Sequence, residues 1–301
     1  MNWLFEPGFF SSEPVHVAVV IGIVVAVVSS TVGVFTVMRA QSFAGHSLSD
    51  ISAAGGSGAF LAGINPLFGF IGGGVIGAGA MEMIGIRRAR GRDLATGIVL
   101  GASIGLAALF LYLSTTSSSN TGASQQILFG SIFYADSSTV PIVVCFGVLC
   151  VAIMALVHRP LLLSSVDNDI AAAQGVPLRM IGILYMVALA LAVGLSSLAI
   201  GAILSTALLI GPAATALRLT RRVCWAYLTA AVTGVLATLI GIVLAYDSYD
   251  WTAGHQPWPV SFFIVALVFL AYLATELPFI RRSADRRTVQ NPSLHGQGAP
   301  G

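Results

Sequence analysis

The sequence contains no lysine, and charged residues of all types make up only 9% of its 301 positions, whereas hydrophobic residues make up 56%. Soluble domains carry roughly a quarter charged residues, so this chain has too few charges to cover a surface that faces water. The mean hydropathy of +0.91 agrees with this interpretation. The composition therefore excludes an ordinary soluble domain and predicts an integral membrane protein.

Three further absences restrict the classes of function that the chain can have. A Walker A loop needs a lysine that reaches the nucleotide phosphates, so ATP hydrolysis by that route requires a separate subunit. The sequence contains neither an H-E-x-x-H motif nor another histidine pair typical of a metalloprotease. The cysteines number only three, and they show no metal-type spacing: Cys145, Cys150 and Cys224. We expect no catalytic residue, no permanently bound cofactor and no nucleic-acid partner.

Apolar segments long enough to cross a bilayer, which requires roughly 20 residues, recur along the chain. They predict an all-α, polytopic membrane protein with eight or nine transmembrane helices. The segment at 200–217 is short and contains Gly211-Pro212, so we expect a broken or half helix there. The nine candidate segments are 15–38, 43–63, 66–86, 94–114, 139–157, 180–199, 200–217, 223–246 and 259–280.

The arginines predict the orientation. With nine crossings, all 14 fall on one side of the membrane, which the positive-inside rule makes cytoplasmic. Residues 1–14 are then extracytoplasmic, 15–282 form the transmembrane domain, and 283–301 form a disordered cytoplasmic tail. The opposite side carries acidic residues, which form either a solvated rim or a funnel for a cation: Glu6, Glu13, Asp136, Asp247 and Asp250.

Two ionisable side chains lie within the second segment. His46 and Asp50 are one helical turn apart on one face, at a depth where an ionisable residue is costly and therefore indicates a function by default. Imidazole nitrogen and carboxylate oxygen are together ligands for zinc, manganese or iron. The alternative is a hydrogen-bonded pair that ties helices together.

Other polar and small residues have plainer interpretations. Glu82 and Glu276 lie near arginines at the predicted cytoplasmic edge, where we expect structural ion pairs. We expect His16, Asp250 and His255 to be solvated. Glycines recur every four positions in two segments, which predicts close helix packing: Gly69, Gly73 and Gly77, and Gly97, Gly101 and Gly105.

The predicted cytoplasmic segment 158–180 contains a capped helix. Ser165 or Asp167 begins it, Asp169 lies in its first turn, and Gly175 followed by Pro177 ends it. A short helix between two membrane spans serves either as a docking element or as a simple connector.

Four blocks of sequence, in this order, resemble the permease subunit of metal-type ABC importers, and the similarity covers nearly the whole chain apart from both termini. The blocks are GVFTVMRAQSFAGHSLSDISAAGG, ILFGSIFYAD at 127–136, RPLLLSSVDNDIAAAQGVPLRM, and LAIGAILSTALLIGPAATALRL at 198–219. The resemblance implies a reduced relative of the cobalamin and siderophore permease fold in the cell membrane. It also implies import of zinc, manganese or iron by a homodimer, with a cytoplasmic ATP-binding subunit and an extracytoplasmic metal-binding protein.

The resemblance assigns roles to two sets of residues. Family members commonly read G-D-A-L-S-H where this chain reads GHSLSD, so His46 and Asp50 keep the ligand chemistry in swapped order as a metal transit site. The docking interpretation now outweighs the connector interpretation for the segment at 166–175, which resembles the coupling helix. Its residues are Val166, Asp167, Asn168, Asp169, Ile170, Ala171, Ala172, Ala173, Gln174 and Gly175.

Two rival functions remain open at the level of sequence. A proton-coupled secondary metal transporter would use the same histidine and aspartate as a proton relay. A permease for a chelated metal is close in fold, although it is expected to have more spans.

Overall fold

The computed structural model describes residues 12–85, 89–117, 122–130, 132–251 and 258–276. Within these ranges the chain forms helices and no strand, as predicted. The helices are α1 Glu13–Met38, α2 Ser42–Leu61, α3 Pro66–Gly85, α4 Ala89–Ser117, α5 Ala123–Phe129, η2 Ile132–Tyr134, α6 Thr139–Val166, α7 Asn168–Ala173, α8 Leu178–Ile200, α9 Ser205–Leu219, α10 Val223–Asp247, η3 Ser248–Asp250 and α11 Val260–Ala274.

Each of the nine predicted membrane segments corresponds to one long helix, namely α1 to α4, α6 and α8 to α11. Within the described residues, α1, α4, α6, α8 and α10 are long and apolar enough to cross a bilayer by themselves. Helix α2 is as long as α3 but is not among the apolar helices, because serines, glycines, His46 and Asp50 interrupt its apolar sequence. A helix of this composition depends on its neighbours for shielding from lipid.

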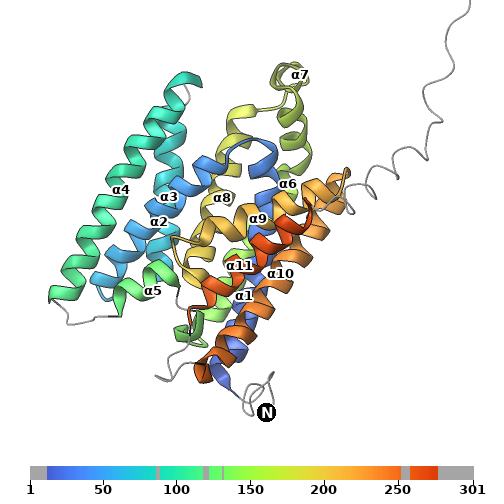
Figure 1. Ribbon diagram of the computed structural model, residues 1–301. Coiled ribbons are helices and arrows are strands. Elements are labelled where there is room, and N and C mark those ends of the chain that lie inside the picture. Colours follow the sequence, from blue (N-terminus) through green and yellow to red (C-terminus); the bar gives the residue numbers. More distant parts are fainter. Residues whose placement is uncertain (1–11, 86–88, 118–121, 131, 252–257, 277–301) are drawn as a thin grey trace, which may run out of the picture.

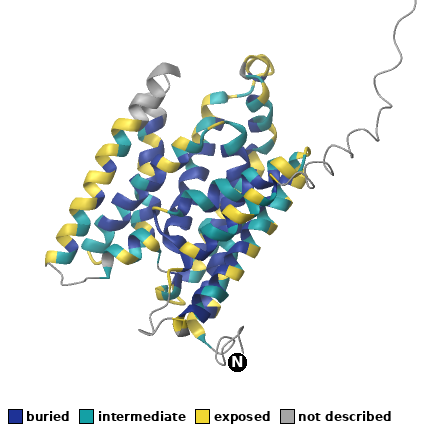
Figure 2. Cartoon of the chain, viewed as in Figure 1, coloured by how far each residue is buried: buried dark blue, intermediate teal, exposed yellow. Residues whose placement is uncertain are grey.

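The core of the bundle is built around α8. Nearly all residues of α8 from 185 to 200 are buried, and α1 is also mostly buried, whereas α4 is the most exposed of the apolar helices. Figure 2 shows the buried residues gathered along the middle of the bundle, with α4 at its periphery. Figure 1 places α7 at one end of the bundle and α5 at the opposite end.

The contact between α2 and α3 depends on glycine. A Cβ atom at Gly55 would overlap the carbonyl oxygen of Gly69 and lie 2.9 Å from Cα of Gly73. The predicted close packing of the Gly69, Gly73 and Gly77 stripe is therefore confirmed. The same prediction for the second stripe is wrong among the described residues, because a Cβ at Gly97, Gly101 or Gly105 would meet none of their atoms within 4 Å.

The chain breaks between α8 and α9, although not where the sequence predicted. Helix α9 continues through Gly211-Pro212, and the interruption lies at 201–204. Gly201 has φ 84° and Gly130 has φ 94°, and the two backbones cross so closely that a Cβ at Gly201 would overlap the carbonyl of Leu128. The amide of Ala202 donates to the carbonyl of Ile127 at 3.0 Å. This crossing fixes the break, since only glycine has both the conformational freedom and the small size.

A matched pair of glycines tests this packing. We expect Gly55→Ala to lower stability by about 1–3 kcal/mol through overpacking, whereas Gly101→Ala should leave it unchanged or raise it by up to about 1 kcal/mol through helix propensity. Thermal unfolding in detergent measures both. Equal melting temperatures for the two variants would contradict the packing argument.

Candidate metal transit site

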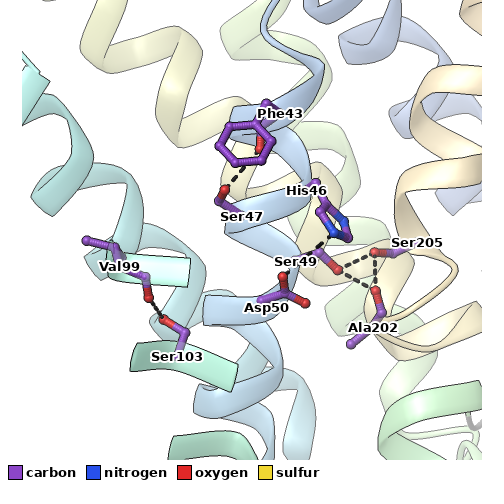
Figure 3. A network of polar contacts seen from close by, with 9 residues as sticks. All are labelled: Phe43, His46, Ser47, Ser49, Asp50, Val99, Ser103, Ala202 and Ser205. Carbon is purple, nitrogen blue, oxygen red and sulfur yellow. Dashed lines mark hydrogen bonds and ion pairs between the residues drawn. The ribbon is translucent and has the colours of Figure 1, made fainter. Parts of the chain in front are cut away.

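His46 and Asp50 extend from the same side of α2, as predicted. Nε2 of His46 lies 3.9 Å from Oδ2 of Asp50 across one helical turn, and Figure 3 shows the two side chains side by side. This distance is too long for a hydrogen bond, and among the described residues neither side chain bonds to another helix. The alternative of a hydrogen-bonded pair that ties helices together is therefore not realised.

The surroundings of the two side chains differ. The side chain of His46 is 48% exposed, whereas that of Asp50 is 16% exposed and its Oδ2 atom is buried without a hydrogen-bond partner. A buried carboxylate oxygen without a partner is costly. The pair thus combines an imidazole nitrogen that is accessible from outside the chain with a carboxylate oxygen that has no hydrogen-bond partner.

A serine between the two residues fixes α2 against the break in the chain. Ser49 Oγ lies 2.5 Å from the carbonyl oxygen of Ala202, to which it donates, and 2.6 Å from Oγ of Ser205. Because the Ser49 proton goes to Ala202, the Ser205 hydroxyl donates to Ser49, and its oxygen lies 3.0 Å from the carbonyl oxygen of Ala202 (Figure 3). These contacts hold the site to the start of α9. They were not predicted from the sequence, in which a serine near the pair was the only indication.

The remaining predicted residues lie elsewhere. Glu276 forms an ion pair, as expected, and its partner is Arg218 in the last turn of α9, whose guanidinium lies 4.3 Å from the centre of the Tyr272 ring. His16 is exposed. The side chains of Glu82 and Asp250, and all of His255, lie outside the described residues. Within the described part of the chain, no three His, Cys, Asp or Glu residues are grouped to hold a metal ion.

The segment predicted as a coupling helix forms a helix, shorter than the predicted 166–175. Helix α7 covers Asn168–Ala173, while Val166 ends α6 and Gln174 caps α7. Asp167 is the N-cap, because its carboxylate accepts the amides of Asp169 and Ile170 at 2.8 and 3.1 Å. The left-handed conformation of Gly175, with φ 76°, ends the segment.

Two apolar side chains at α7 are exposed. Val166 is 81% exposed and Ile170 is 51% exposed, whereas Ala171 is buried. Asp169 in the first turn is also exposed. This end of the bundle therefore presents an apolar patch, consisting of Val166 and Ile170, next to an acidic side chain.

The opposite end of the bundle contains a pocket and a buried acid. A pocket of about 290 Å³ lies between α5, η2 and the start of α11, and its lining includes Gln125, Tyr134 and Trp258. Asp136 is exposed, as a solvated rim requires, but Asp247 is only 7% exposed and neither of its carboxylate oxygens has a hydrogen-bond partner. The prediction of a solvated rim is therefore wrong for Asp247.

This architecture defines the chain as a multi-pass α-helical membrane permease. The family model described as "ABC 3 transport family" matches residues 11–276, and the chain belongs to this family. The family is one of permeases and not of enzymes.

Named relatives cover most of both chains. The manganese transport system membrane protein MntC of Listeria innocua is 28% identical over 270 residues, which are 89% of this chain and 94% of the relative. MntC of Halalkalibacterium halodurans is 30% identical over 253 residues, 84% and 85% of the two chains. A chain in the solved structure of PsaBC from Streptococcus pneumoniae in complex with Fab superposes with a TM-score of 0.76 at 25% identity, covering 89% of this chain and 92% of that one.

Two buried serines on α2 test the anchoring of the site. We expect Ser49→Ala to destabilise the protein by about 1–3 kcal/mol, because it removes a hydrogen bond to Ala202 and leaves buried polar groups at α9 less satisfied. Ser47→Ala is the control, since Ser47 is equally buried but bonds only to Phe43 on its own helix. The melting temperatures of the two variants in detergent measure the difference, and a loss as large for Ser47→Ala would contradict the anchoring role.

Proposed function

We propose that this chain is the permease subunit of an ATP-driven importer of divalent transition metal ions, in which His46 and Asp50 contact the ion in transit. The observation that carries the proposal is the unsatisfied carboxylate oxygen of Asp50 beside the exposed imidazole of His46 on a membrane helix. An imidazole exposed to lipid is unfavourable. Its exposure from the single chain is better explained by a water-filled path or by a second protein surface.

A homodimer completes this site. One chain supplies one nitrogen and one oxygen ligand, and the described residues contain no third ligand close to them. Two copies related by a two-fold axis would bring two histidines and two aspartates together, which is enough for a four-ligand site. The exposed side of α2 that carries His46 would then face the partner copy across the path.

Manganese is the first metal to test. Relatives with 28–30% identity are named as manganese transport proteins, and imidazole nitrogen with carboxylate oxygen suits manganese, iron and zinc. The order of the two residues is swapped relative to the common family pattern. The geometry of the two ligands can therefore differ from that of other family members. The preference among these metals can differ with it.

Two further partners complete the importer. The exposed patch at α7 supports docking of a cytoplasmic ATP-binding subunit, because short apolar surfaces beside a capped helix suit a groove on a partner. An extracytoplasmic metal-binding protein would then deliver the ion at the opposite end, beside α5. In this proposal the N-terminus would lie outside the cell and the C-terminus in the cytoplasm, which agrees with the arginine distribution.

Removal of both proposed ligands tests the transit role. We expect the double variant His46→Ala, Asp50→Ala to reduce uptake of labelled manganese by about tenfold or more, since loss of metal-site groups typically costs 10–100-fold. The measurement is uptake into cells that lack the native gene, with membrane insertion checked by blotting.

Ser47→Ala is the matched control, because it lies between the two ligands and points to its own helix. Uptake by the double variant at the rate of the control would remove the transit site. Uptake that persists without the ATP-binding subunit and disappears when the proton gradient is dissipated would instead support a secondary transporter.

A charge reversal at α7 tests the docking role. We expect Asp169→Lys to weaken co-purification with the ATP-binding subunit by about tenfold, because the exposed carboxylate would be replaced by the opposite charge at the contact. Asp169 is chosen because its side chain does not form the helix cap, so α7 itself should remain folded. Unchanged co-purification of Asp169→Lys together with Ile170→Ala would remove the docking assignment.

A further inference from the structure

A single arginine lies in the turn between α1 and α2. Arg39 is the C-cap of α1, and only Ala40 and Gln41 separate it from α2. Ala40 has φ 52°, the left-handed conformation that is rare for residues other than glycine. The amide of Gln41 donates to the carbonyl of Thr36 at 2.9 Å. The turn is therefore tight, and a shift of Arg39 is passed directly to the start of α2.

On one side Arg39 holds the end of α6. One guanidinium nitrogen, Nη1, donates to Oγ of Ser164 at 3.0 Å and to Oγ of Ser165 at 3.3 Å. Each hydroxyl donates its own proton to the carbonyl of Leu161, at 3.0 and 2.6 Å. The serine lone pairs are therefore available to the arginine, and the direction of every bond is defined. Ser165 is two residues before Asp167, the cap of α7.

On the other side Arg39 contacts α8. Its guanidinium carbon lies 5.6 Å from the centre of the ring of Tyr185, within the range of a cation–π contact. Tyr185 is fully buried, and its hydroxyl lies 3.0 Å from Oγ1 of Thr36. Thr36 donates its own proton to the carbonyl of Val32, so Tyr185 is the donor to Thr36.

These contacts gather three parts of the chain at one cation. Helix α6 precedes α7 and helix α8 follows it in the chain. Arg39 contacts α6 and α8, and it lies in the turn that leads into α2. His46 lies seven residues further along, on the order of 10 Å at the helical rise per residue. The planar, forked guanidinium can contact two acceptors and an aromatic face simultaneously, which an ammonium group does less well.

We propose that Arg39 is a positioning residue that couples α7 to α2, so that a displacement of α7 reorients the helix that carries His46 and Asp50. The inference rests on the proposed function, because it assigns the route by which a docked ATP-binding subunit acts on the transit site. The route is short: Ser164 and Ser165 move with α6, the guanidinium follows them, and the tight turn passes the movement to α2.

The first experiment measures coupling in the complete importer. The chain is reconstituted in liposomes with its ATP-binding subunit and binding protein, and Mn²⁺ transported is compared with ATP hydrolysed. We expect Arg39→Ala to preserve assembly and basal ATP hydrolysis but to lower the Mn²⁺ transported per ATP by about fivefold or more, the lower range of allosteric coupling. Arg39→Lys should restore part of the ratio. A wild-type ratio in Arg39→Ala overturns the proposal.

Two further variants separate coupling from general structure. Ser164→Ala combined with Ser165→Ala keeps the arginine but removes both acceptors, so it should lower the ratio in the same direction. Arg222→Ala is the control, since Arg222 is an exposed cation at the start of α10, and it should keep the wild-type ratio. If Arg39→Ala fails to assemble, the double serine variant and Arg39→Lys decide the question, and wild-type ratios in both overturn the proposal.

A second measurement does not depend on transport. Spin labels at the exposed positions Phe43 on α2 and Ala172 on α7, in a background without the three native cysteines, report the distance between the two helices. We expect Arg39→Ala and the double serine variant to broaden the distance distribution, whereas Arg222→Ala should not. An unchanged distribution overturns the coupling route. A wild-type complex that hydrolyses ATP without moving Mn²⁺, Fe²⁺ or Zn²⁺ would overturn the proposed function while leaving this structural test intact.

Discussion

The structure depends on one constraint, which is that polar groups at membrane depth must find partners inside the protein. Helix α2 is the clearest case, because it combines glycines, serines and two ionisable residues in a length that would otherwise cross a bilayer. Ser47 and Ser57 donate to carbonyls of their own helix, Ser49 donates to the break before α9, and the glycines of α2 allow α3 to approach closely. Two buried oxygens of α2 have no hydrogen-bond partner among the described residues, Oγ of Ser52 and Oδ2 of Asp50. Only the second belongs to an ionisable group, and this makes the pair with His46 chemically informative.

The same constraint explains the arrangement of the helices around α2. The apolar helices α1 and α8 supply the buried centre, and α3 and α4 cover one side of the polar helix. The crossing of Gly130 and Gly201 brings the backbone carbonyl of Ala202 to Ser49. A locally irregular segment is tolerated within a membrane bundle because protein, and not lipid, surrounds it. The anchoring of the site therefore depends on a break in the chain that lies about 150 residues away in sequence, at 201–204.

Much of this could be predicted from the sequence, and the limits have physical reasons. Hydropathy located the membrane helices, because most of their residues are apolar even where a helix is interrupted by polar residues, as in α2, or is short, as in α9 and α11. The spacing of His46 and Asp50 placed them on one face, because helical periodicity is local. Close packing was wrongly predicted for the glycine stripe of α4. A repeat of small residues indicates that another helix can come close to that surface, but it does not indicate that a helix is there. The contact of Ser49 with Ser205 was invisible, because it joins residues that only the fold brings together.

The absence of lysine matters for the proposed coupling at Arg39 as well as for nucleotide binding. Every fixed positive charge in the side chains is a guanidinium, and at Arg39 the difference matters, because two hydroxyl acceptors and an aromatic face lie around one group. A single ammonium in this position would satisfy the charge at the end of α6 but would not hold α6 and α8 in a fixed relation. Helix α2 is thus constrained at two places, at its start by Arg39 and in its middle by Ser49. Any change in the orientation of His46 and Asp50 must move α6, α8 or the start of α9 at the same time, which is the mechanical requirement for a site that opens and closes with a docked partner.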